Sequence, residues 1–218
     1  MNDSPWRRYV SLFTTTPIDI DSSELVAALE DAFRKSGVPG PYNTEINAPN
    51  NKKGAPVVKV ETSNGTSGVW IGNHLIFMPV GSDEDLGRLF SALTATKLAA
   101  LGLHSYSLNS ARLSKVAAEQ ARQSTNPEVI DLLNNKQSQE FSKNVTKQIS
   151  DTLTAKDVIT ISRSENDDLN IDMNIAIDSA EMSSGQTVGA MLPEINFEKL
   201  KAHEDEIKQQ ADSIIIGR

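Results

Sequence analysis

The chain has 218 residues, 38% hydrophobic and 5% aromatic, and its 21 Lys and Arg side chains are outnumbered by 29 Asp and Glu, for a net charge of −8. It contains no cysteine, which excludes disulfides and thiolate metal sites. Transmembrane helices need about 18 consecutive apolar residues, and neither such a run nor the layout of a signal peptide is present. We therefore expect a cytoplasmic protein without a membrane or nucleic-acid partner, since nucleic-acid binding needs a basic surface.

The first half of the sequence alternates between strand and helix patterns. Apolar groups alternate over residues 8–14, which predicts a strand, and Asp21 followed by Glu24 is a helix start signal. The apolar stripe of that helix lasts until Gly37, and a loop rich in Gly and Pro follows, with a short strand near 44–47. The remaining expected elements are strands at 57–61, 69–71 and 74–78 and a helix at 82–101. This order predicts an α+β fold with an antiparallel sheet that carries both helices on one face.

Helix, three strands and helix over residues 22–102 follow the same order as in the double-stranded-RNA-binding domain, so this region resembles that family in topology. The family needs a basic start to its second helix, which spans phosphates. Here that position reads Ser82-Asp83-Glu84-Asp85, which would repel them. We therefore do not carry RNA binding over from the resemblance.

The second half has a different pattern and holds most of the negative charge, with 12 basic against 18 acidic side chains after residue 108. We expect two domains, 1–108 and 109–218, or one composite domain. Predicted here are a helix from 109 to 123, a helix starting at Asn126-Pro127, and a sparse helical stripe of apolar residues at 141, 145, 149 and 153. A β-hairpin with arms at 158–161 and 169–177, and a last charged helix over 197–211, complete this half.

The most distinctive local pattern alternates polar and apolar residues from 168 to 175. In a strand, its polar members share one face: Asp168, Asn170, Asp172 and Asn174. One interpretation is a ladder of oxygen ligands for Ca²⁺ or Mg²⁺, as a metal-dependent enzyme would use. The other is the solvent face of a half-buried strand, whose charges discourage edge pairing or contact a partner. We favour the second, because alternation alone explains the spacing.

Three consecutive isoleucines, Ile214, Ile215 and Ile216, close the last helix pattern. Exposed β-branched triplets are an aggregation hazard. We expect the triplet to form a final strand that joins its own sheet, or alternatively a segment that pairs with another chain.

No motif identifies a reaction. The sequence has three histidines, of which we place His203 on an exposed helix face, and no phosphate-binding loop. We therefore expect no catalytic residue and no cofactor, and a non-catalytic interaction or assembly protein that contacts a protein partner or a second copy of itself. The alternative is a metal-dependent hydrolase or nucleotide-processing enzyme that uses the Asp168 and Asp172 face.

Overall fold

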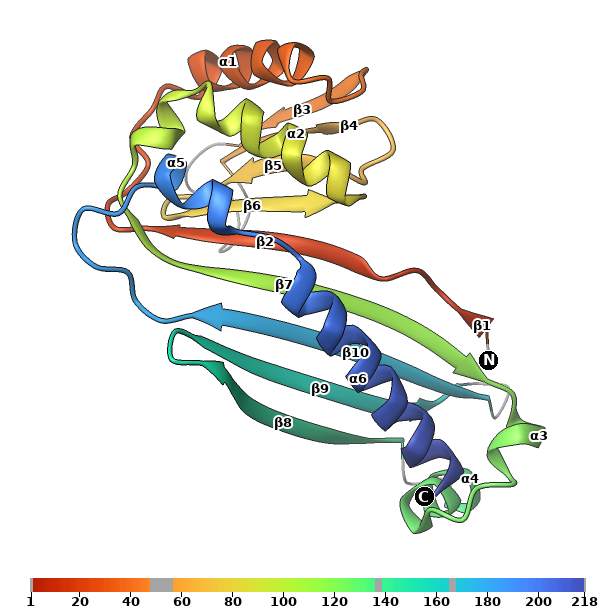
Figure 1. The fold of residues 1–218 in the computed structure, drawn as a ribbon. Helices are drawn as coiled ribbons and strands as arrows, with labels where there is room; N and C mark the ends of the chain where they lie inside the picture. The colour runs from red at the N-terminus through yellow and green to blue at the C-terminus, as the bar shows by residue number, and fades with distance from the viewer. Residues whose placement is uncertain (1, 48–56, 136–138, 165–167, 218) are drawn as a thin grey trace. The chain divides into compact units, whose positions relative to one another are not determined.

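The computed structural model describes residues 2–47, 57–135, 139–164 and 168–217, and these form the expected α+β fold (Figure 1). None of the helices within these ranges combines the length and the apolar character that a membrane span requires.

The described residues form two compact units, each built from segments that are distant in the sequence. The first unit comprises Arg8–Leu108 and Asp178–Phe197. The second unit comprises Met1–Arg7, Asn109–Ile177 and Glu198–Arg218. Both units therefore take segments from both halves of the chain, and the division into separate domains 1–108 and 109–218 stays a prediction.

The first unit is an antiparallel sheet with two helices on one face. Its strands lie in the order β3, β4, β5, β6, β2, followed by the first part of β7. Figure 1 shows α1 and α2 side by side on the same face, as predicted, and their leucines are buried against the sheet. The element bounds are β2 Arg7–Thr14, α1 Ser22–Lys35, β3 Tyr42–Ile46, β4 Val58–Thr62, β5 Gly68–Ile71, β6 Leu75–Val80, α2 Asp83–Thr94, η1 Lys97–Ala100, β7 Leu103–Val116, α5 Val188–Met191 and η2 Leu192–Glu194.

Local signals explain both ends of α1 and the start of α2. Asp21 accepts the backbone N–H groups of Ser23 and Glu24, and Gly37 adopts a φ of +74° just after the helix. The expected length of α2 was wrong: it ends at Thr94 instead of continuing to Leu101. The chain turns extended at Thr96, whose hydroxyl accepts the N–H of Leu98 and so starts the short 3₁₀ helix η1.

The other face of this sheet carries a row of aromatic rings. Phe77 lies between Tyr9 and Trp70, at ring-centroid distances of 5.3 and 5.1 Å. Trp70 Nε1 donates to Glu61 Oε2 (3.1 Å), and Lys59 Nζ lies 2.9 Å from Glu61 Oε1 and 4.9 Å from the Trp70 ring centroid. The Glu61 carboxylate is thus buried with two donors, which satisfies it at the end of the row.

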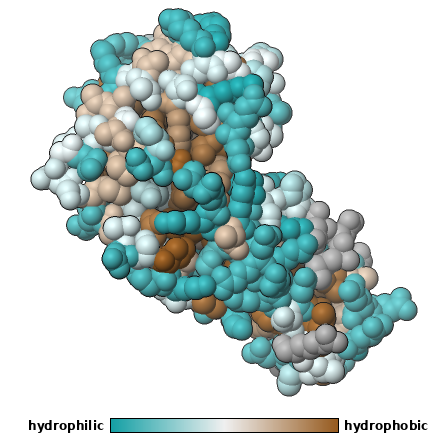
Figure 2. Space-filling view, in the orientation of Figure 1, coloured by the Kyte–Doolittle hydropathy of each residue, from teal (hydrophilic) through white to brown (hydrophobic). Residues whose placement is uncertain are grey.

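The second unit is an antiparallel sheet with α6 over β9. Its strands lie in the order β7, β10, β9, β8, and β1 pairs with β7. Hydrophilic residues cover most of the visible surface over α6 (Figure 2). The element bounds are β1 Asn2–Asp3, α3 Ala118–Ala121, α4 Pro127–Asn134, β8 Glu140–Ser150, β9 Leu153–Arg163, β10 Leu169–Ser179 and α6 Glu198–Ile216.

Two helix predictions in this half are wrong. Residues 109–116 belong to strand β7, and only the short helix α3 remains of the helix expected over 109–123. Residues 140–150 form strand β8 in place of a helical stripe. The apolar residues of that stripe recur every four positions, a spacing that shares a face in both a helix and a strand, so periodicity alone does not distinguish the two.

The three isoleucines are the last turn of α6, so the expected strand is also wrong. Ile215 is 3% exposed, whereas Ile216 is 51% exposed. Asn126 Nδ2 donates to the carbonyl of Ile214 (3.0 Å), and Thr125 Oγ1 donates to that of Ile216 (3.2 Å). These bonds satisfy two of the carbonyls that a helix end leaves without partners.

Candidate functional site

The structure separates the four polar residues of the 168–175 pattern. Asp168 precedes β10, and its Oδ1 accepts the N–H of Ala118 (3.1 Å). Asn170 is half-buried, while Asp172 and Asn174 are exposed and joined by a hydrogen bond from Asn174 Nδ2 to Asp172 Oδ1 (3.1 Å). Their apolar neighbours in β10 are buried, as the alternation predicts. Among the described residues, no group of three or more His, Cys, Asp or Glu side chains is placed to hold a metal ion. The metal-binding interpretation therefore stays a prediction.

The expectation that His203 lies on an exposed helix face is wrong. The side chain is buried between α6 and β9. Its Nε2 lies 2.9 Å from Asp157 Oδ2, and its Nδ1 lies 3.3 Å from Glu206 Oε2. Lys147 Nζ lies 3.1 Å from both Glu206 oxygens, so the chain of charges reaches the surface at β8. Burial raises the pKa of Asp157, and the neighbouring His203 opposes this shift.

The buried pair is close but poorly aligned. His203 Nε2 and Asp157 Oδ1 have no hydrogen-bond partner of good geometry within the described part of the chain. Both ring nitrogens nevertheless face carboxylates, which leaves neither free to exchange a proton with a bound molecule. We interpret the cluster as a link between α6 and the sheet.

The sequence contained signals for this link that we missed. Asp157 alternates with the buried Ala155 and Ile159, so it belongs to the apolar face of β9. His203 lies three residues after Leu200 and four before Ile207, on the buried stripe of α6. The other two histidines lie apart from this cluster: His104 is exposed, 3.7 Å from Glu181, and His74 Nδ1 is 3.3 Å from the carbonyl of Thr14.

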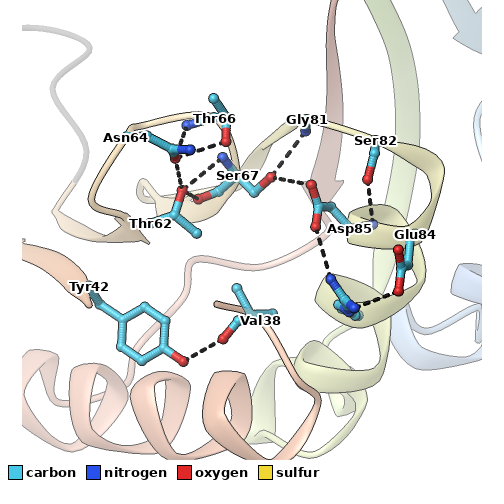
Figure 3. Close-up of polar contacts among 11 residues, drawn as sticks. Val38, Tyr42, Thr62, Asn64, Thr66, Ser67, Gly81, Ser82, Glu84 and Asp85 are labelled. Carbon is cyan, nitrogen blue, oxygen red and sulfur yellow. Dashed lines mark hydrogen bonds and ion pairs between the residues drawn. The ribbon is translucent and has the colours of Figure 1, made fainter. Parts of the chain in front are cut away.

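A second polar cluster ties the β4–β5 turn to the start of α2 (Figure 3). Ser67, which is 1% exposed, donates from Oγ to Asp85 Oδ2 (3.1 Å) and accepts the N–H of Gly81 (3.0 Å). Thr62 Oγ1 donates to Asn64 Oδ1 (2.7 Å) within the turn. Ser82 caps α2, because its hydroxyl oxygen accepts the N–H of Asp85 (3.1 Å). The hydroxyl of Ser67 is committed at both its donor and its acceptor side, so it serves structure and not nucleophilic attack.

Strand β8 is the most open element of the second unit. It has eleven residues, none of which is buried. It lies at the end of the strand order and pairs, in the described part of the chain, with β9 alone. The pairing is regular from Glu140 to Gln148 and shifts only at the far end, between Gln148 and Ser150. One whole side of β8 thus presents unpaired backbone groups.

A groove of about 740 Å³ runs beside this strand, on the side of α6. From β8 it is lined by Phe141 and Lys143, and from α6 by Glu206 and Ile214. Pro127, at the start of α4, also lines it. One of the three predicted tail residues, Ile214, therefore faces a cavity, while Ile215 is buried in the core. The groove and the open edge together form the candidate interaction site.

Comparisons with known proteins do not assign this chain to a family. No family model matches the sequence, and no curated protein matches it. A search of solved structures finds the apo immunity protein TplEi of the T6SS from Pseudomonas aeruginosa, which is 7% identical over 90% of this chain and 87% of that one, with a TM-score of 0.18. A TM-score this low carries no argument about fold or function.

Proposed function

We propose that this protein is a non-catalytic interaction protein, and that it binds its partner through the open edge of β8. The observation that carries this proposal is the eleven-residue edge strand, which pairs on one side only among the described residues. Strands average five to six residues, so this edge is about twice the ordinary length. An extended segment of another chain can hydrogen-bond to such an edge and continue the sheet.

The composition of β8 is typical of an edge strand that is protected against unwanted pairing with other strands. Natural edge strands avoid unwanted pairing by being short, strongly bulged, covered or charged. β8 uses charge, at Lys143 and Lys147, and its bulge lies only at the end. Its middle section from Phe141 to Thr146 is regularly paired with β9, and none of its residues is buried. Such an edge resists random aggregation while it remains accessible to a matching segment.

The test begins with a random-peptide library displayed on phage, from which peptides that bind the full chain are selected. Their affinities are then measured by fluorescence anisotropy. Two variants, Asn144→Pro and Val145→Pro, are compared with wild type. Successive N–H groups of a strand point to opposite edges, so one variant removes an outward donor and the other removes a donor to β9. The variant that retains the circular dichroism spectrum and melting temperature of wild type is the informative one.

We expect enriched peptides that bind wild type and lose at least tenfold in affinity for that variant. NMR amide hydrogen exchange provides the same test without substitution, because peptide binding would slow the outward amides of β8. Failure to enrich any peptide, or binding that leaves the β8 amides and the proline variant unaffected, would overturn the proposal.

A further inference from the structure

Resting on this proposed function, we infer which segment the edge accepts: an extended partner segment in which an acidic residue stands between two apolar residues at alternate positions. The inference combines the face pattern of β8, the one unmatched lysine on that face, and the groove beside it.

The side chains of β8 divide sharply between its two faces. The face turned toward α6 carries Phe141, Lys143, Val145 and Lys147, since Lys147 reaches Glu206 of that helix and all four pair with buried residues of β9. Up to the register shift near Ser150, the other face carries only polar side chains, at Ser142, Asn144, Thr146 and Gln148. Cross-strand neighbours on one face contact each other directly, so the α6 face is the one that distinguishes partners by side chain.

The two lysines on this face differ in their surroundings. Lys147 is paired with Glu206, at 3.1 Å from both carboxylate oxygens. The side chain of Lys143 is exposed, and its ammonium group makes no hydrogen bond or ion pair with any described residue. A carboxylate on an added strand, directly opposite Lys143, would complete an opposite-charge pair, whereas a lysine there would be repelled.

Apolar positions lie on both sides of Lys143. Phe141 and Val145 are two residues away in either direction, about 7 Å along the strand. Phe141 is half-buried and lines the groove together with Ile214. An apolar side chain opposite Phe141 would therefore lose contact with water in this groove, and one opposite the half-buried Val145 would lose it against that side chain. The resulting pattern of apolar, acidic and apolar residues is the same in both directions, so it does not depend on a parallel or antiparallel approach.

A second copy of β8 matches this face less well. Full antiparallel overlap places Val145 opposite its copy, which puts Lys143 of each chain opposite Lys147 of the other. Like charges directly opposite each other destabilise an antiparallel pair. The face therefore favours a different, acidic segment as its occupant over self-pairing.

The test uses three labelled and end-capped peptides: TVTETVT, TVTKTVT and TTTETTT. Their affinities are measured by fluorescence anisotropy for wild type, for Lys143→Glu, and for the control Lys115→Glu, which makes the same charge change at an exposed position of β7. We expect wild type and the control to bind TVTETVT about three- to tenfold more tightly than either other peptide, as cross-strand pair energies suggest. Lys143→Glu should reverse the preference between TVTETVT and TVTKTVT.

The proline variant described above separates the two proposals. If TVTETVT and TVTKTVT bind equally well and both lose binding on proline substitution, the acidic pattern is overturned. Strand addition at β8 is then still supported. Binding insensitive to that substitution, or no binding of TVTETVT up to millimolar concentration, would overturn the inference. A dimer in sedimentation equilibrium that disappears in the proline variant would identify a second copy as the occupant and overturn it too.

Discussion

His203 Nε2 and Asp157 Oδ2 lie 2.9 Å apart, with both side chains almost completely buried between α6 and β9. Glu206 and Lys147 extend this contact to the surface beside the open edge of β8. The helix that forms one wall of the candidate groove is thus attached to the sheet by ionisable groups as well as by apolar packing.

Removal of Asp157 from the Asp157–His203 pair should lower the free energy of unfolding. Asp157→Ala removes the carboxylate that faces His203 Nε2, and loss of a partner for a buried polar group typically costs about 1–3 kcal/mol. We expect a loss of this size in the free energy of unfolding, measured by urea denaturation at neutral pH. The control Lys147→Ala removes an exposed ion pair and should cost only about 0–1 kcal/mol. Equal losses in the two variants would contradict the role given to the buried pair.

The same pair predicts a pH dependence of stability. Burial raises the pKa of Asp157 above its ordinary value, and Glu206 adds to this, whereas His203 and Lys147 oppose it. A carboxyl with a raised pKa in the folded state stabilises the fold while protonated, and that contribution is lost as the pH rises through the folded pKa. Relative to Asp157→Asn, wild type should therefore become less stable as the pH rises from the ordinary pKa of an aspartate to the raised pKa of Asp157. Urea denaturation over a pH series measures the difference, and a difference that grows in favour of wild type would contradict the sign.

The hydroxyl of Ser67 should matter for the stability of the first unit. Ser67→Ala leaves the N–H of Gly81 and one oxygen of Asp85 without this partner, in two partly buried hydrogen bonds. The net contribution of such a hydrogen bond is about 0.5–1.5 kcal/mol. Thermal unfolding should show a lower melting temperature, whereas Ser63→Ala, on the exposed part of the same turn, should change it little.

Gly68 should tolerate no side chain. A Cβ at this position would lie 2.6 Å from the Cβ of Glu61 and 2.7 Å from the carbonyl oxygen of Val60, on the paired strand. Gly68→Ala should therefore destabilise the chain by about 1–3 kcal/mol or more through overpacking. Gly87 in α2 has no atom within 4 Å of such a Cβ, so Gly87→Ala should stabilise by about 0.5–1 kcal/mol. Chemical denaturation of both variants should show these opposite signs.

The last turn of α6 allows a paired comparison of adjacent isoleucines. Ile215→Ala empties a buried site and should cost about 2–4 kcal/mol, whereas Ile216→Ala, at an exposed site, should lie within about 0.5 kcal/mol of wild type. Urea denaturation measures both. A large effect of Ile216→Ala on self-association, with no effect on stability, would instead support the earlier hypothesis that the tail pairs with another chain.

The sequence by itself determined those elements whose signals are local. Asp21 and Gly37 delimit α1, Ser82 caps α2, and alternation places the apolar face of β10 in the core. These features depend on backbone donors and acceptors within a few residues, or on a period of two, and both can be read from neighbouring letters. The α+β class follows from their order.

Tertiary structure decided what local patterns leave ambiguous. Apolar residues four positions apart fit a helix or a strand equally well, and pairing with β9 made β8 a strand. Ile215 became a core residue because α6 continues to Ile216 and packs on its own unit. The Asp157–His203 contact joins residues 46 positions apart, and the groove joins β8 to a helix distant in sequence. Such relationships arise from strand pairing and helix packing between remote segments, for which no single stretch of sequence carries the information.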